Sequence, residues 1–364
     1  MKILGIETSC DETAAAIVEN GDQILSNVVV SQIDIFASYG GVIPEIAARS
    51  HLEAILPVIH QAFTEAGLKP NDWSKINAIA VTHTPGLLGS LLVGTLSART
   101  ISILHHIPFY PVHHLKSHIY ANWLDKQTSK SDSKTTPEFP LISLIISGGH
   151  TQIIKMPTHQ QFEIIGTTKD DAVGECFDKV AKILGLPYPG GPSITKTAAN
   201  GDPTRYTFPH PMSGSLDFSF SGLKTAVLRE VQKAVNQPIS FPSSKLAELL
   251  NPQQKADFAA SFEQTATDIL IEKIKLALRQ NPETKTLIIA GGVSANQRLR
   301  HDLTKFIEQQ NSKLSTKIKL FFPEPHFSGD NGAMVASAAY YEILSNVPPT
   351  DPYTLNILPR SIIK

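Results

Sequence analysis

The chain opens with the stretch MKILGIETSCDETAAAIVENGDQILSNVVVS, residues 1–31. Three short segments in it, residues 2–9, 14–19 and 23–31, are rich in apolar and β-branched side chains, and charged or polar residues separate them. Short apolar segments divided by polar turns predict three consecutive β-strands. The stretch that follows decides whether these strands belong to an all-β or a mixed fold.

The rest of the first half alternates predicted helices and strands. Residues 44–67 begin with Pro and end with Gly, which favours a helix, and Pro57 inside them predicts a break in that helix. After it, we expect a strand, a helix, a strand and a helix at residues 76–82, 87–105, 109–112 and 114–124.

The second half repeats this order. Three strands are predicted at residues 141–147, 151–156 and 162–167, and a helix at 173–184. A long stretch with polar, Pro and Gly residues and further helices then interrupts the pattern. It resumes with a strand, a helix, a strand and a helix at residues 286–290, 294–307, 318–321 and 331–344.

Two βββαβαβα units in tandem predict an α/β fold of the actin-like class, in which two ribonuclease-H-like halves flank an inter-domain cleft. Two unrelated α/β domains would give the same pattern. The predicted limits are an N-terminal half, a polar linker, a C-terminal half with a helical insertion, and a tail: residues 1–126, 127–139, 140–346 (insertion at about 192–279) and 347–364.

Composition limits the kinds of function. The chain has 364 residues, a formal net charge of -1 and two cysteines, Cys10 and Cys176. A near-neutral protein binds RNA only through a local basic patch or a partner. Two thiols make no disulfide framework, the N-terminus lacks the pattern of a signal peptide, and no run of roughly 18 apolar residues is present. We therefore expect a cytoplasmic protein that makes no use of a membrane.

A histidine cluster is the clearest candidate metal site. His114 and His118 are one helical turn apart, so their imidazoles can reach one ion, whereas His113 lies off that face. Asp330 is a candidate third ligand of a two-His, one-carboxylate site, although a helix N-cap explains it equally well. Leu115 stands where a zincin protease would have its catalytic Glu. Histidines without a metal remain an alternative.

Two glycine turns and one acidic turn complete the candidate residues. Residues 147–150 (SGGH) lie between two predicted strands, and residues 291–296 (GGVSAN) lie between a strand and a helix. Backbone N–H groups in such turns can bind a phosphate or the edge of a nucleoside. Asp11 and Glu12 follow the first strand, where they could position a water, a metal or an amine, or simply form a solvated turn.

Eight segments together resemble the tRNA N6-adenosine threonylcarbamoyltransferase family, in its bacterial TsaD form. They occur in the family's order from residue 2 to about 345: GIETSCDET (5–13), PGLLGSLLVG (85–94), HHLKSH (113–118), SGGHT (147–151), GECFDK (174–179), YPGGP (188–192), FSFSGLKT (218–225) and GGVSAN (291–296). Two departures are Thr82-His83-Thr84, where members often have Ala and Gly, and Thr195, where some members have Asp.

The resemblance implies an actin-like fold and assigns residues to roles. It implies metal ligands at His114, His118 and Asp330, with Fe²⁺ or Zn²⁺ as the ion. It implies that Asp11 is functionally important near the chemistry; Asp11 or Glu12 is the candidate base that takes the proton of the amine. The implied substrate contacts are Ile145, Ile146, Ser147, Gly148, Gly149, His150, Asp178, Gly191 and Asn296. Whether Thr195 contacts substrate stays open.

The resemblance also implies a reaction. The threonylcarbamoyl group of threonylcarbamoyl-adenylate passes to the N6 amine of the adenosine 3′ of the anticodon, in tRNAs that read codons beginning with A, and AMP leaves. TsaB-like and TsaE-like proteins are the implied partners. A metallo-glycoprotease, an actin-like sugar or acetate kinase, and a structural subunit of a tRNA-modifying complex are the alternatives.

Overall fold

The computed structural model describes residues 1–124, 136–313 and 317–363. Contacts divide the chain into two compact units: unit 1 comprises 1–138, 156–163 and 323–364, and unit 2 comprises 139–155 and 164–322. Residues 323–346 were expected in the C-terminal half, but by contacts they pack in unit 1. A division by contacts does not define domains, so the predicted domain limits stay a prediction. Much of the predicted linker, residues 125–135, lies outside the described residues.

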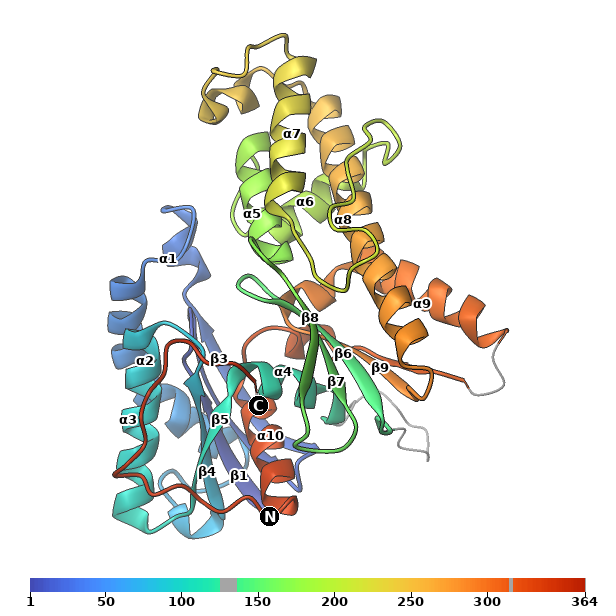
Figure 1. Ribbon diagram of the computed structural model, residues 1–364. Helices are drawn as coiled ribbons and strands as arrows, with labels where there is room; N and C mark the ends of the chain where they lie inside the picture. The colour runs from blue at the N-terminus through green and yellow to red at the C-terminus, as the bar shows by residue number, and fades with distance from the viewer. Residues whose placement is uncertain (125–135, 314–316, 364) are drawn as a thin grey trace. The chain divides into compact units, whose positions relative to one another are not determined.

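Unit 1 is built on a five-stranded sheet in the order β3-β2-β1-β4-β5 (Figure 1). β1 pairs antiparallel with β2 and parallel with β4, and β4 pairs parallel with β5. The strands are β1 Lys2–Glu7, β2 Glu12–Glu19, β3 Gln23–Ser31, β4 Ala78–Thr84 and β5 Phe109–His113. The helices are α1 Ile33–Ala37, α2 Pro44–Glu65, α3 Leu88–His105, α4 His114–Tyr120 and α10 Gly332–Leu344, with short 3-10 turns η1 Trp73–Lys75, η2 Ala121–Trp123 and η5 Pro325–Phe327.

Alternation along β1 assigns its two faces to different helices. Leu4 and Ile6 join an apolar cluster with residues of α2 and α3, among them Ile55 and Val93. Gly5 points the other way, onto α10. Figure 1 shows α2 and α3 on one side of this sheet and α10 on the other. A period-two pattern therefore buries both faces of β1.

Unit 2 repeats the sheet order. Its strands run β10-β9-β6-β7-β8, so the third, second, first, fourth and fifth strands are neighbours in both sheets. The strands are β6 Leu141–Ile146, β7 Thr151–Met156, β8 Glu163–Thr167, β9 Thr286–Ala290 and β10 Lys319–Phe321. The helices are α5 Val173–Leu184, α6 Gly190–Ala198, α7 Ser221–Ala234, α8 Pro252–Gln280 and α9 Gln297–Asn311, with 3-10 turns η3 Ser243–Glu248 and η4 Gly292–Ala295. The predicted α/β architecture of two similar halves is confirmed.

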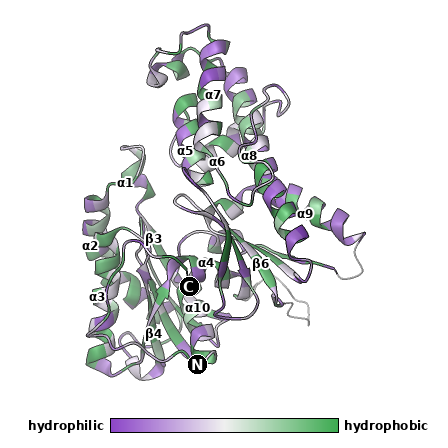
Figure 2. Ribbon diagram, in the orientation of Figure 1, coloured by the Kyte–Doolittle hydropathy of each residue, from purple (hydrophilic) through white to green (hydrophobic). Residues whose placement is uncertain are grey.

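Two local predictions were wrong. α2 is continuous through Pro57, because this residue is exposed and water can satisfy the carbonyl that loses its N–H partner. α9 begins at residue 297, not 294, because the Asn296 side chain caps it by accepting the N–H of Leu299. The strands are largely hydrophobic, whereas helix α9 is rich in hydrophilic residues (Figure 2).

One helix in the described part of the chain, α3, has the length and apolar composition of a membrane span. Core helices of water-soluble proteins share these properties, and the inner side of α3 packs in the cluster with β1 and α2. Its composition alone therefore assigns it to neither environment.

We expect Gly5→Ala to destabilise unit 1. A Cβ at Gly5 would lie 2.2 Å from the carbonyl oxygen of Gly332 and 2.6 Å from the nitrogen of Ala336, both backbone atoms. Such overpacking costs about 2 kcal/mol or more in the free energy of unfolding. Hydrogen–deuterium exchange of the β1 and α10 amides measures it. Gly222→Ala in α7, where the added Cβ meets nothing nearer than 3.9 Å, is the control, and equal protection of β1 in wild type and Gly5→Ala would contradict the packing.

Candidate active site

Three potential metal ligands meet in unit 1. His114 begins α4 directly after β5, His118 follows one turn later, and Asp330 lies just before α10. Oδ1 of Asp330 is 3.1 Å from Nε2 of His118 and 3.6 Å from Nε2 of His114. One ligand atom from each residue lies within 4.8 Å of the other two. The structure thus brings together the three residues predicted from the sequence.

The surroundings of His118 fit a metal ion. Its side chain is almost fully buried. Within the described chain neither ring nitrogen makes a hydrogen bond, although Nε2 lies close to Asp330. Leaving buried polar atoms without a partner costs free energy, which a bound ion would offset. Two imidazoles and one carboxylate are a donor set that Fe²⁺ and Zn²⁺ accept.

Two residues next to the candidate ligands, His113 and Asn331, cap helices. His113, predicted to lie off the metal face, caps α4, since its Nδ1 accepts the backbone N–H of Leu115. Burial lowers the pKa of His113 to about 3, which keeps this nitrogen able to accept. Asp330 does not cap α10, because the Asn331 side chain accepts the N–H of Met334 instead. The N-cap explanation for Asp330 is therefore wrong, and its carboxylate faces the histidines.

Glu7 contacts the candidate metal site, and the sequence analysis did not single it out. Its side chain is fully buried at the end of β1. Oε2 accepts hydrogen bonds from Oγ1 of Thr82 (2.6 Å) and from Nδ1 of His114 (3.1 Å), and Oε1 accepts the backbone N–H of Ser9 (2.5 Å). An acceptor on Nδ1 places the His114 proton there and leaves Nε2 as the ligand atom. Sequence offered one signal, an acidic residue inside an apolar strand.

Charge also acts on His114. Burial alone would lower its pKa, but the carboxylates of Asp330 and Glu7 outweigh that effect and raise the pKa to about 9. A metal ion must therefore displace a proton from this ring at neutral pH. The carboxylates that attract the proton attract a cation for the same reason.

Asp11 and Glu12 lie at the entry to β2. Burial and the negative charges of Asp330 and Asp11 raise the pKa of Glu12 well above its usual range. A carboxyl group with a raised pKa is a stronger base once ionised. His51 of α2 anchors this turn: its Nδ1 lies 2.8 Å from Oγ1 of Thr13 and its Nε2 lies 3.0 Å from the carbonyl oxygen of Cys10. Burial lowers the His51 pKa, so the ring is neutral.

In unit 2, the turn between β6 and β7 exposes its backbone. Ser147 and His150 close the turn through the Ser147 N–H, which donates to the His150 carbonyl (2.9 Å). Gly148 and Gly149 are exposed. A Cβ on either would meet no atom within 4 Å, whereas a Cβ at Gly174 of α5 would lie 2.9 Å from the Gly148 nitrogen. Ile145 and Ile146 are different, because both side chains are fully buried. Of these two residues, the backbone is what a ligand could contact.

The second glycine turn contacts the first strand of the same sheet. Gly291 has φ of +87°, and a Cβ there would lie 2.4 Å from the carbonyl oxygen of Ile146. Glycine is therefore required both by the backbone conformation and by the contact. The structure brings the GGVSAN turn to the end of β6, where the SGGH turn begins.

The remaining predicted contacts form two hydrogen-bonded groups. Oδ1 of Asp178 accepts the N–H of Gly190 (2.7 Å), which positions Gly191 at the start of α6. Nδ2 of Asn296 donates to Oε1 of Glu263 (2.7 Å) and to Oγ1 of Thr195 (3.0 Å). Glu263, buried in α8, was not singled out from the sequence, because one acid in a long helix carries no local signal.

Comparison with known proteins identifies the family of the chain. The family model described as tRNA N6-adenosine threonylcarbamoyltransferase matches residues 23–337. A protein of that name from Symbiobacterium thermophilum is 47% identical over 340 residues, which are 93% of this chain and 91% of the relative. One from Thermomicrobium roseum is 45% identical over 349 residues, covering 94% and 92%. The chain belongs to the tRNA N6-adenosine threonylcarbamoyltransferase family.

Solved structures extend the likeness of fold beyond this threonylcarbamoyltransferase family. Full-length HypF in its phosphate- and nucleotide-bound form superposes with a TM-score of 0.56 at 12% identity, over 96% of this chain and 47% of that chain. HypF of T. kodakarensis gives a TM-score of 0.53, over 95% of this chain and 48% of that chain, also at 12% identity. At these identities the likeness concerns the fold alone.

In this member of the threonylcarbamoyltransferase family we expect Glu7→Gln to weaken metal binding by about 10- to 100-fold, the usual effect of losing a carboxylate behind a histidine ligand. An amide cannot accept from Nδ1 of His114 with the same charge, and its NH₂ group would face donors. Titration of Zn²⁺ or Co²⁺ against a chelator measures the dissociation constant directly.

Glu19→Gln is the control for this measurement, because Glu19 is partly exposed and pairs with Lys2 at 3.0 Å. An unchanged metal affinity in folded Glu7→Gln protein would show that the carboxylate does not orient His114.

Proposed function

We propose that the chain transfers the threonylcarbamoyl group of threonylcarbamoyl-adenylate to the N6 amine of the adenosine 3′ of the anticodon, in tRNAs that read codons beginning with A, with release of AMP. The observation that carries this proposal is the His114, His118 and Asp330 cluster, in a chain of this family. The bound ion would be Fe²⁺, with Zn²⁺ as the second choice, since both suit two imidazoles and a carboxylate.

The reaction is an acyl-type transfer from an activated donor. The amine nitrogen bonds to the carbamoyl carbon, the bond from that carbon to the phosphate oxygen breaks, and the electron pair leaves with AMP. Because the anhydride is already activated, the protein needs no Ser or Cys nucleophile. When bound, the metal would supply positive charge that stabilises negative charge developing on oxygen.

The chain's own residues have three tasks in this proposal. The N–H groups at Gly148 and Gly149, and those of the turn at Gly291 and Gly292, bind the phosphate of the adenylate. Glu12 or Asp11 takes the proton that the N6 nitrogen loses as the new bond forms. His51 does not touch the substrate and keeps the turn that carries these acids in place.

The test is to mix the protein, threonylcarbamoyl-adenylate and unmodified tRNA, with and without partner proteins, and to follow threonylcarbamoyladenosine by nucleoside mass spectrometry. We expect product from the wild type, and loss of on the order of 100-fold or more in rate for His114→Ala, His118→Ala and chelator-treated enzyme. His60→Ala, an exposed histidine of α2, is the control. Full activity of the complex with its partner proteins in all three metal-site conditions would indicate that this chain has a structural role in it.

We also propose TsaB-like and TsaE-like proteins as partners and the cytoplasm as the location. Both cysteines are free, as in a reducing compartment. Unit 1 offers an apolar face on α2 and α3, where large apolar side chains are exposed at helical spacing: Leu52 (65%), Leu56 (68%), Leu88 (51%), Leu92 (37%) and Leu96 (50%). A contiguous apolar face of this kind is typical of a protein interface, and we assign it to the TsaB-like protein.

We expect the double variant Leu52→Asp, Leu56→Asp to lose binding to the TsaB-like protein by at least about 100-fold, since two charges would be buried without partners. Isothermal titration calorimetry measures it. Ile239→Asp, at a 70% exposed apolar position in unit 2, should bind like the wild type. Equal affinity of the double variant would place the interface elsewhere.

A further inference from the structure

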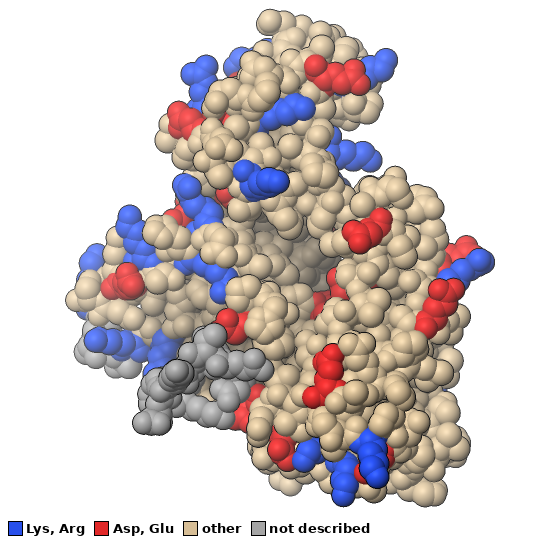
Figure 3. Space-filling model, turned by 180° about the vertical axis from the view of Figure 1, so that it is seen from behind, with Lys and Arg blue, Asp and Glu red and all other residues tan. Residues whose placement is uncertain are grey.

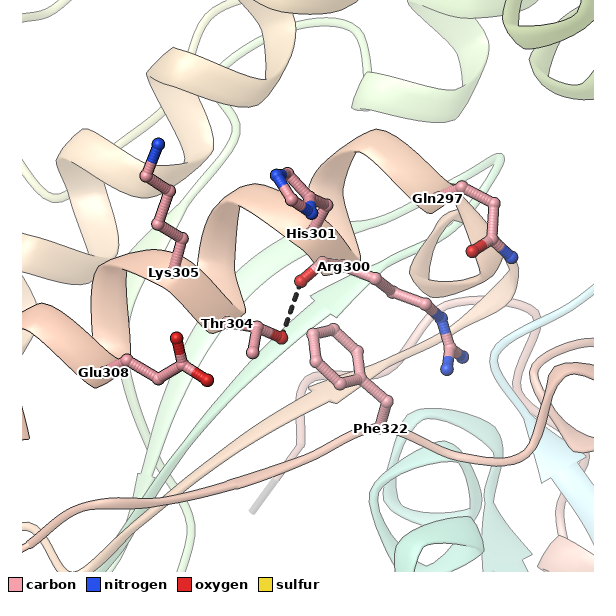
Figure 4. A pocket seen from close by; sticks show the side chains of 7 residues that line it. All are labelled: Gln297, Arg300, His301, Thr304, Lys305, Glu308 and Phe322. Atoms are coloured by element: carbon pink, nitrogen blue, oxygen red, sulfur yellow. Dashed lines mark hydrogen bonds between the residues drawn. The ribbon is translucent and has the colours of Figure 1, made fainter.

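A basic groove lies along α9 in unit 2. Six of the residues that line it follow one stripe of the helix, namely Gln297, Arg300, His301, Thr304, Lys305 and Glu308, and Phe322 closes its other wall. The groove has a volume of about 580 Å³. Figure 4 shows Arg300 and Thr304 on the side of α9 near the Phe322 ring, whereas His301 and Lys305 extend from the other edge of the helix. It contains none of the residues assigned above to the transfer reaction.

Positive charge is concentrated on this part of an otherwise neutral chain. Residues 297–319 contain six Lys and Arg against two Asp and Glu, whereas the whole chain has 32 against 33. The space-filling view shows Lys and Arg side chains gathered on the side of unit 2 that carries α9 (Figure 3). One of the two acids, Asp302, already pairs with Arg298 at 3.1 Å. Lys305, which lines the groove, and Lys313, just after α9, are exposed members of this basic set.

Arg300 is held in place for a contact. Its Nε donates to the carbonyl oxygen of Ser294 (2.7 Å), and its guanidinium lies over the Phe322 ring, 4.8 Å from the centroid. A guanidinium fixed in this way loses little side-chain entropy when it binds an anion. Lys305 and Lys313 are exposed, and in the described part of the chain neither side chain makes an ion pair or a hydrogen bond.

We propose that the α9 groove binds the phosphate backbone of the RNA substrate. The inference rests on the proposed function, because it takes tRNA as the polyanion. A near-neutral protein repels RNA less than an acidic one but gains attraction only where cations cluster. Arg300 and Lys305 are five residues apart, about 7.5 Å along the helix axis, so they can contact separate phosphates of one strand. Glu308, on the same stripe, opposes this attraction and limits the contact toward the end of α9.

Binding of fluorescently labelled, unmodified tRNA by the full-length chain, with and without its partners, tests the proposal through anisotropy across a series of salt concentrations. The groove variant Arg300→Glu, Lys305→Glu, which changes two residues that line the groove, should bind at least about tenfold more weakly near physiological salt, with a less steep salt dependence. Glu308→Gln should bind more tightly. The matched control, Lys233→Glu with Lys245→Glu, makes the same charge change at two exposed positions of unit 2 and should bind like the wild type.

Three results would overturn the groove as an RNA site. The first is that the control pair weakens tRNA binding as much as the groove variant does. The second is that the groove variant binds tRNA like the wild type. The third is that the groove variant changes only how well AMP or inorganic phosphate competes, which would indicate a small-anion site. An unchanged tRNA affinity together with lost affinity for a partner protein would assign the groove to that protein.

Product formation is measured separately. A groove variant with a raised KM for tRNA and an unchanged kcat supports the proposal. A wild-type protein that binds tRNA without modifying it contradicts the transfer reaction alone.

Discussion

The buried carboxylate of Glu7 is the constraint on which unit 1 depends. A charge without solvent contact is stable when its oxygens accept hydrogen bonds from fixed donors. Here those donors are the Ser9 N–H, the Thr82 hydroxyl and Nδ1 of His114. The sheet order supplies them, since β1 pairs in parallel with β4 and Ile6 lies beside Val81, which puts Glu7 next to Thr82. β5 follows β4 in the sheet and leads directly into α4.

The same strand also positions the third ligand. Gly5 faces α10 so closely that no side chain fits between them. Asp330 precedes that helix by two residues, so the seating of α10 on β1 determines where its carboxylate lies. One face of β1 thus packs against α10, and Glu7 at the end of β1 hydrogen-bonds to His114. A candidate metal site with ligands up to about 200 positions apart, His114, His118 and Asp330, therefore depends on the packing of one strand.

Sequence predicts what depends on local pattern. Strand and helix order, the one-turn spacing of His114 and His118, and the glycine turns all repeat at short range. What it missed depends on distant partners. Two partners of Glu7, Thr82 and His114, are 75 and 107 residues away, and the one signal in the sequence, an acid within an apolar strand, does not identify them. Asp330 could be a cap or a ligand until Asn331 proved to be the cap. The start of α9 was placed too early for a local reason, since the Asn296 side chain caps the helix by accepting the N–H of Leu299.

The hydrogen bonds around Asn296 bear on what a ligand can do in unit 2. Its two N–H groups point to Glu263 and Thr195, and its Oδ1 accepts from Leu299. A substrate that hydrogen-bonds to Asn296 must therefore compete with a buried carboxylate. The Thr195 hydroxyl donates to the same oxygen, Oε1 of Glu263, at 2.6 Å. An Asp at this position would instead place a second negative charge beside Glu263, whereas the threonine of this chain keeps one carboxylate there, oriented by two donors.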